Sequence, residues 1–193
     1  ALAFAPLIKL EKDALDNEDI EKMARIIEEG SVEVYRIEKK PSDIAKHLDA
    51  VLNNLQQFGL ASTESKITRY YGGIYFSYAQ AIGIDTILNV ISHIEEHFKD
   101  ICLAALLSSV SDIVNTVGKQ FAQPLKMRDA HGNLKVGSMR KIHKDRSIDV
   151  LSLFREWLRR YLAVTPGEPT IVKKQDYYQT LLSLPDDIRI VYA

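Results

Sequence analysis

The stretch DICLAALLSSVSDIVNTV, residues 100–117, indicates that this protein is built mainly from packed α-helices. Its apolar residues recur at the three- and four-residue spacing that places side chains on one face of a helix. The predicted buried stripe consists of Leu103, Leu106, Val110, Ile113 and Val117. Small residues between them, Ala104, Ala105, Ser108 and Ser109, would let neighbouring helices approach closely. Gly118 is expected to end the helix, because glycine is common just after a helix terminus.

Segments on both sides of this helix show a similar periodicity. Asn17, followed by Ile20, Met23, Ala24 and Ile27, predicts a capped amphipathic helix that ends at Gly30. Three further helices are predicted. The first runs from Pro41 to Gly59, and its buried stripe consists of Ile44, Leu48, Val51, Leu52 and Leu55. The second begins at Asp85 and has the stripe Ile87, Ile91, Ile94 and Phe98, and the third runs from Ser147 to Leu162 with the stripe Val150, Leu151, Phe154 and Leu158. Residues 31–37 alternate as in a short strand, and residues 119–146 lack sustained periodicity, which predicts a long polar connection.

The last part of the sequence has a different pattern. Two short apolar runs, 170–172 and 188–192, flank a helical stretch near residues 177–184, which is the strand, helix, strand order of a parallel sheet. Two strands are too few for such a sheet, and the sequence begins at Ala1 without a methionine. We therefore expect a mainly α protein of the α+β type that is an internal piece of a larger chain.

The bulk composition is that of an ordered protein. With 46% hydrophobic and 26% charged residues among 193, the chain can bury a core. Its single cysteine, Cys102, lies in an apolar run and is interpreted as a buried core thiol rather than a nucleophile. With no internal disulfide possible and no secretory signal pattern, the chain is expected to be intracellular. Ser108 and Ser109 interrupt the apolar run well short of the ~20 residues of a membrane span, so no membrane crossing is expected.

Positive charge is concentrated in one segment, although the whole chain carries a net charge of only −1. Residues 119–160 contain eleven Lys and Arg against four acidic residues, a net charge of +7, whereas the remainder carries −8. A basic loop that leads into a helix with Arg155, Arg159 and Arg160 is a reasonable phosphate-binding surface, since each neutralised phosphate releases counterions. The alternative is a solvated loop whose charge is incidental.

Two further motifs have both a functional and a structural interpretation. His93, Glu96 and His97 match the H-x-x-E-H pattern of zinc peptidases, but no third ligand can be assigned and a polar helix surface explains them better. The segment from Thr68 to Tyr78 gathers four tyrosines and a phenylalanine around Gly72 and Gly73. Such rings can stack on extruded bases, or they can anchor a loop by ordinary packing.

At this segment the sequence resembles the Dam-like, site-specific DNA adenine-N6 methyltransferases. The resemblance covers three stretches. The first is RYYGGIYFSYAQAI, residues 69–82, and it continues to Ile84. The second is NTVGKQFAQPL, residues 115–125, and the third is the closing IRIVYA, residues 188–193. It implies a helical target-recognition region inserted into a Rossmann-like methyltransferase sheet. Residues 1–40 would then be a remnant of the cofactor-binding domain, residues 41–165 the DNA-binding region, and residues 166–193 the strand-helix-strand return to the catalytic sheet.

The resemblance also implies what this sequence lacks. The catalytic Asp-Pro-Pro-Tyr tetrapeptide and the glycine-rich turn that cradles S-adenosylmethionine are both absent, although Asp176 resembles a later cofactor-facing position. The intact family enzyme uses S-adenosylmethionine, whereas this chain alone is expected to bind it poorly and to transfer no methyl group to DNA. The implied location is the cytoplasm of a prokaryote, at the nucleoid, and the implied partners are double-stranded DNA and the remaining parts of the enzyme.

For DNA contact the resemblance singles out two sets of residues. Phosphate contacts are expected from the basic side chains Lys119, Lys126, Arg128, Lys135, Arg140, Lys141 and Lys144. Groove, flipped-base or space-filling contacts are expected from Arg69, Tyr70, Tyr71 and Tyr75, with Gly72 and Gly73 letting the backbone approach. The alternative function is a non-enzymatic helical module that binds a protein partner.

Overall fold

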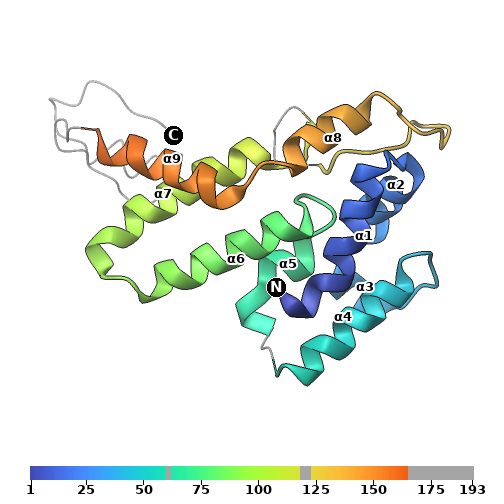
Figure 1. Cartoon of the computed structure of the whole chain (residues 1–193), viewed down its shortest axis with the longest axis horizontal. Coiled ribbons are helices and arrows are strands. Elements are labelled where there is room, and N and C mark those ends of the chain that lie inside the picture. The colour runs from blue at the N-terminus through green and yellow to red at the C-terminus, as the bar shows by residue number, and fades with distance from the viewer. Residues whose placement is uncertain (60–61, 118–122, 165–193) are drawn as a thin grey trace, which may run out of the picture. The chain divides into compact units, whose positions relative to one another are not determined.

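A computed structural model describes residues 1–59, 62–117 and 123–164 of the chain. The chain divides into two compact units, Ala1–Ala163 and Val164–Ala193. The predicted strands at 170–172 and 188–192, with the helical stretch between them, lie outside the described residues. Unit 1 is mainly helical (Figure 1), and β pairing among the described residues is limited to three isolated bridges. The mainly α prediction is confirmed for this unit.

Most elements of unit 1 follow one another along the chain with short connections, and the exception is the link from α7 to α8, residues 114–137. They are η1 (Leu2–Phe4), α1 (Ala5–Asp16), α2 (Ile20–Glu29), α3 (Val32–Glu38), α4 (Ala45–Gln57), η2 (Ser62–Ser65), α5 (Lys66–Tyr71), α6 (Tyr78–His93), α7 (Glu96–Ile113), α8 (Ser138–Arg146) and α9 (Val150–Leu162), where η denotes a 3₁₀ helix. In the described part of the chain, no helix is both long enough and apolar enough to cross a membrane.

The first hydrophobic core joins α1, α2, α3 and α4. Its fully buried side chains include Leu7, Met23, Ile26, Leu48 and Val51, each with 0% of its surface exposed. The predicted stripes of the helices ending at Gly30 and near Gly59 face this core, as expected for amphipathic helices. The boundary predicted near residue 40 therefore falls inside unit 1, where α1, α2 and α3 pack with α4.

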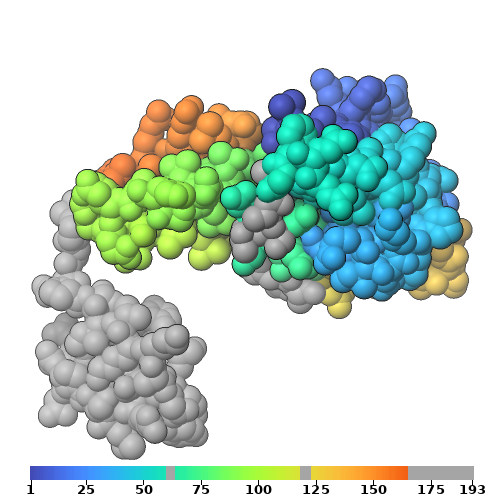
Figure 2. Space-filling model, turned by 90° about the horizontal axis from the view of Figure 1, so that it is seen from below, coloured from blue at the N-terminus to red at the C-terminus, as the bar shows by residue number. Residues whose placement is uncertain are grey.

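The second core joins α6, α7 and α9. Ile87, Ile91, Leu106 and Ile113 are buried there, and Phe154 of α9 packs partly buried against them. Cys102 is one of the partly buried residues around this core, in line with a structural thiol. Figure 2 shows one face of unit 1, with α3 and α4 in blue to turquoise on the right and α6 and α7 in green on the left.

The strand predicted at residues 31–37 is wrong, because this segment forms α3. The hydroxyl of Ser31 accepts a hydrogen bond from the Val34 amide and so caps the helix. Val32 and Tyr35, three residues apart, are buried, whereas Val34 is 53% and Ile37 73% exposed. The burial thus follows helical spacing, and the apparent alternation of the sequence does not correspond to two faces of a strand.

The helix predicted to begin at Asp85 begins earlier, at Tyr78. A capping box starts it, in which Ser77 accepts from the Gln80 amide and Gln80 accepts from the Ser77 amide. Asp85 lies inside α6 and caps a different helix: its carboxylate accepts from the amides of Ile67 and Thr68, at 3.0 and 2.8 Å. Asp85 is therefore not the cap of the helix that follows it, and the helix that it does cap lies earlier in the chain.

Two other boundaries differ from the sequence-based expectation. The backbone becomes extended at Ile94, so the predicted single stripe through Ile94 and Phe98 is divided between α6 and α7. The central helix ends at Ile113, which leaves Val117 58% exposed rather than buried.

The long polar connection expected over residues 119–146 contains α8, whose apolar anchors are only Met139 and Ile142. Two anchors are too few to produce a sustained periodicity in the sequence.

A buried ion pair connects these parts of the fold. Arg146, at the end of α8, has a fully buried side chain and pairs with Glu11 of α1. Its guanidinium also donates to the Asn115 side chain at 2.8 Å and to the carbonyls of Gly73 and Ile74 at 2.8 and 3.2 Å. The second oxygen of Glu11 accepts from the Tyr78 amide at 2.8 Å. One guanidinium therefore ties together α1, the turn before α6, the end of α7 and α8.

Neighbouring hydrogen bonds extend this connection. The Gln80 side chain donates to the carbonyls of Asp145 and Ile148, at 2.7 and 3.1 Å, which fixes the link between α8 and α9. The Asn115 side chain donates to Asp145, and its backbone amide donates to the carbonyl of Tyr75. The position of α8 is thus set by these buried polar groups together with Met139 and Ile142, which lie in the first core.

Replacing Arg146 should therefore destabilise the protein strongly. We expect Arg146→Met to lower the free energy of unfolding by about 3–5 kcal/mol, because it leaves the buried Glu11 carboxylate without its cation. The exposed Arg155→Met on α9 is the matched control and should change it by less than about 0.5 kcal/mol. Urea unfolding followed by circular dichroism measures both. Equal stability of the two variants would contradict the assigned role of Arg146.

Candidate nucleic-acid interface

The basic segment begins with an ordered turn, residues 126–135. Met127 anchors it in the first core with 0% exposure, and the Lys135 amide donates to the Met127 carbonyl at 2.8 Å. The Asp129 carboxylate accepts from the amides of His131 and Asn133, at 2.8 and 2.9 Å. These bonds close the turn locally and leave Lys126 and Lys135 exposed at its base.

Helix α8 presents a basic face to solvent. Its apolar side chains Met139 and Ile142 are buried in the first core, which turns Arg140 and Lys144 outward. These two residues are four apart and therefore neighbours on one face of the helix. Lys141 is half-buried, and its ammonium lies 3.5 Å from the carbonyl of Thr116. A hollow of about 590 Å³ beside Arg140 is lined also by Glu18, Ile20, Val136, Gly137, Met139 and His143.

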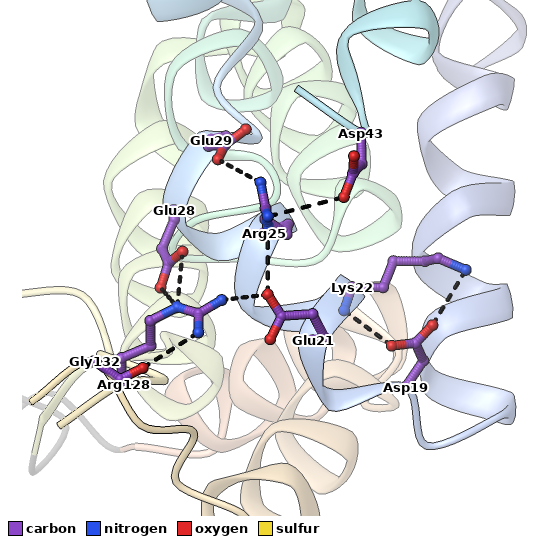
Figure 3. A network of polar contacts seen from close by, with 9 residues as sticks. All are labelled: Asp19, Glu21, Lys22, Arg25, Glu28, Glu29, Asp43, Arg128 and Gly132. Carbon is purple, nitrogen blue, oxygen red and sulfur yellow. Dashed lines mark hydrogen bonds and ion pairs between the residues drawn. The ribbon is translucent and has the colours of Figure 1, made fainter. Parts of the chain in front are cut away.

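Two arginines of the basic segment are engaged inside the protein. Arg146 is the buried partner of Glu11, so its charge is neutralised within the fold. Arg128 reaches from the turn to α2, where it donates to Glu21 at 2.6 Å and to Glu28 at 3.0 Å (Figure 3). The hydrogen bond from Arg128 lowers the pKa of Glu21, because it stabilises the charged form of this carboxylate. Counting charges along the sequence therefore overstates the positive charge that faces solvent.

The tyrosine segment places its rings in two different environments. Tyr70 and Tyr71 are 49% and 45% exposed, and Tyr75 is half-buried. Their rings form a chain, with centroids 6.4 Å apart for Tyr70 and Tyr71 and 5.8 Å apart for Tyr71 and Tyr75. Arg69 is only 8% exposed, with its Nε 3.1 Å from a carboxylate oxygen of the buried Glu33. The tyrosines are accessible to a ligand, whereas Arg69 is occupied within the protein.

The two glycines of this segment have a packing role. Gly73 has a φ of +78°, and a Cβ built on it would lie 2.5 Å from the hydroxyl of Tyr78. A Cβ on Gly72 would lie 2.5 Å from the Thr68 carbonyl and 3.0 Å from the Tyr78 ring. Tyr78 is fully buried and donates to the carbonyl of Gly30 at 2.7 Å, and burial raises the pKa of its hydroxyl. The glycines make room for this ring.

The aromatic residues and the cations of α8 are connected through residues 115–117. The Asn115 amide donates to the Tyr75 carbonyl at 2.8 Å, and Lys141 contacts the carbonyl of the next residue, Thr116. The backbone of the tyrosine segment and α8 therefore both contact the same short segment, residues 115–116. Lys119 and Asp176, the remaining predicted contacts, lie outside the described residues.

The H-x-x-E-H pattern does not form a helical metal site. His93 is the last residue of α6, and Glu96 and His97 open α7 after the extended residue Ile94. The two imidazoles are therefore not one turn apart on a single helix, as the pattern requires. Across residues 1–59, 62–117 and 123–164, no group of three or more His, Cys, Asp or Glu side chains is placed to hold a metal ion.

The buried polar connection around Arg146 is the part of the site that sequence analysis missed. Arg146 was counted only as one of the eleven basic residues of segment 119–160, and Asn115 only as part of a matching stretch. The Ser77 to Gln80 capping box was the one local signal near this region. The partner, Glu11, lies 135 residues from Arg146 in the chain, and no pattern in the sequence connects them.

No protein family, curated protein or solved structure matches this chain.

The packing role of Gly73 can be separated from its backbone conformation by comparing it with Gly132. Gly132 also has a positive φ, +84°, but no atom lies within 4 Å of a Cβ built on it. We expect Gly132→Ala to cost about 1 kcal/mol of unfolding free energy from backbone strain alone. Gly73→Ala should cost about 1–3 kcal/mol more, because the new methyl overlaps Tyr78. Urea unfolding compares the two, and equal costs would refute the packing role.

Proposed function

We propose that this chain is the DNA-recognition portion of an S-adenosylmethionine-dependent DNA adenine-N6 methyltransferase. In this proposal, α8 and the turn 126–135 hold the phosphate backbone of double-stranded DNA. The observation that carries it is the exposed basic face of α8, with Arg140 and Lys144 outward and Met139 and Ile142 fixed in the core. The resemblance of residues 69–84 and 115–125 to Dam-like enzymes supplies the choice of partner and reaction.

Electrostatics favours this surface as the place of contact. Lys126, Lys135, Arg140 and Lys144 are all exposed, and they come from two elements anchored in the same core. Cations on a fixed scaffold bind phosphates without a large cost for ordering the backbone, and each phosphate neutralised releases counterions. Such contacts position the protein on DNA but carry no sequence information.

The exposed tyrosines are assigned to base or sugar contacts. Tyr70 and Tyr71 offer ring surface to a ligand, and Tyr75 backs them from its half-buried position. Aromatic rings stack on unpaired bases, which suits an enzyme family that extrudes its target adenine from the duplex. Arg69 is left out of the contact surface because it is buried beside Glu33. The described residues are assigned no part in cofactor binding or in methyl transfer.

The phosphate contacts predict a specific salt dependence. We expect Arg140→Gln/Lys144→Gln to weaken binding of the chain to a short duplex and to reduce the slope of log affinity against log salt by about 0.9 per lost contact. The matched control, Lys12→Gln/Lys46→Gln, removes two exposed charges from α1 and α4 and should leave the slope unchanged. Fluorescence anisotropy over a salt series measures both. Wild-type binding that does not vary with salt would contradict the proposal.

The tyrosines should contribute without changing the salt dependence. Tyr71→Ala is expected to weaken binding to a DNA substrate with an unpaired adenine by about 1–3 kcal/mol, the usual effect of losing one stacking ring. Phe58→Ala, which removes a 55% exposed ring at the end of α4, is the control and should have no effect. If the two substitutions weaken binding equally, the assignment of Tyr71 is wrong.

A second candidate function is docking to a protein partner. It is favoured by exposed apolar side chains on the paired helices α7 and α9, where Leu107 is 63% and Leu162 62% exposed. Size-exclusion chromatography of the chain distinguishes the two functions when it is combined with the DNA titration. A protein that self-associates through these leucines, or that binds no duplex, would favour the interaction module.

A further inference from the structure

Arg128 differs from the other cations of the predicted DNA surface in what surrounds its side chain. We propose that Arg128 is a positioning residue, which clamps the turn 126–135 onto α2, rather than a phosphate contact. The inference rests on the proposed function, since it assigns the clamp a role in presenting Lys126 and Lys135 to DNA. It replaces the sequence-based expectation that Arg128 itself binds phosphate.

The three nitrogen atoms of the Arg128 guanidinium all have partners within the protein. Nη2 donates to Glu21 at 2.6 Å, Nε donates to Glu28 at 3.0 Å, and Nη1 donates to the carbonyl of Gly132 at 3.3 Å. Two of these partners belong to α2, and the third, Gly132, lies four residues further along the same turn. The planar guanidinium therefore bridges the helix and the turn, a geometry that lysine cannot reproduce.

One of the two carboxylates that receive Arg128, that of Glu21, is itself held in place (Figure 3). Arg25, on the same helix, lies 3.4 Å from Glu21 and 3.6 Å from Glu29, and it reaches Asp43 at 4.0 Å. The opposite face of α2 is buried in the first core through Met23, Ala24, Ile26 and Ile27. The clamp thus connects the turn to a helix that is itself fixed by the core.

This arrangement argues against direct phosphate binding by Arg128. A phosphate that approached the guanidinium would meet Glu21 and Glu28 at the same place, and like charges repel strongly at contact distance. The side chain is also only 28% exposed. To bind a phosphate directly, Arg128 would have to give up its charge-assisted hydrogen bonds to Glu21 and Glu28 in exchange for one to the phosphate. Such an exchange brings little net gain in binding free energy.

The clamp has a clear consequence for the exposed lysines of the turn. Lys135 is paired through its backbone amide with Met127, and Arg128 is paired with Leu134 across the same turn. Holding Arg128 on α2 therefore fixes the backbone positions from which Lys126 and Lys135 extend. Ordering these groups before DNA binds removes an entropic cost from the binding step.

The decisive experiment uses the sign of an affinity change. In the full chain, Glu21→Gln/Glu28→Gln removes two negative charges near the basic surface, which by charge alone would strengthen binding to a duplex. A clamp predicts the opposite, about tenfold weaker binding than the control Asp16→Asn/Glu18→Gln, which removes two exposed acidic charges just before α2. Arg128→Lys, which keeps the positive charge, should weaken binding to a similar extent. Binding by either variant that equals or exceeds that of the control would overturn the proposal.

A second measurement does not depend on DNA. Hydrogen exchange of the backbone amides of Asp129, Gly132 and Lys135, all hydrogen-bonded within the turn, should be at least tenfold faster in Glu21→Gln/Glu28→Gln than in the control variant. Amides of α8 should exchange at the same rate in both, since the fold itself is unchanged. If wild-type protein binds no duplex, the proposed function fails, and the exchange rates still decide the clamp. Unchanged exchange in the turn would refute it.

Discussion

The buried pair of Arg146 and Glu11 is the interaction on which the arrangement of this protein depends. A guanidinium removed from water needs both a counter-charge and partners for its remaining N–H groups. Here the charge comes from α1, and the other partners are Asn115 and the carbonyls of Gly73 and Ile74. Satisfying one side chain therefore requires four distant segments to meet in one place. The helix that carries Arg146, α8, acquires a fixed orientation as a result.

That orientation separates the basic segment into internal and external charges. Arg146 stabilises the interior, and Arg128 joins the turn to α2 through Glu21 and Glu28. In the turn and α8, the positive charges that stay exposed are those of Lys126, Lys135, Arg140 and Lys144. The same composition could have produced a mobile basic loop. Anchoring it at Met127, Met139 and Ile142 makes it a surface with defined positions for anionic groups.

The parts of the fold that were predicted from sequence are those with long, local periodicity. The helix ending at Gly30 and the helix with Leu48 and Val51 at its centre follow from the spacing of their apolar residues, although Asp19 rather than Asn17 caps the first and no side chain caps the second. Prediction failed where the outcome depends on a distant partner. Asp85 caps α5 rather than its own helix. The wrong strand at residues 31–37 has a partly local cause, since Ser31 caps α3 and Val32 then packs in the core. The exposed cations were identified from composition, but the engagement of Arg128 and Arg146 required the positions of Glu21, Glu28 and Glu11. The DNA partner and the methyltransferase context stay predictions.

In the proposed function, the exposed face of α8 and the base of the turn 126–135 form the contact surface for DNA. Acetylation of lysines with and without a short duplex, followed by mass spectrometry, tests it directly because every exposed lysine reports its own accessibility. We expect DNA to protect Lys126, Lys135 and Lys144 and to leave Lys12, Lys46 and Lys66, which are exposed on other elements, unchanged. Protection spread evenly over all six lysines, or confined to the second group, would contradict it.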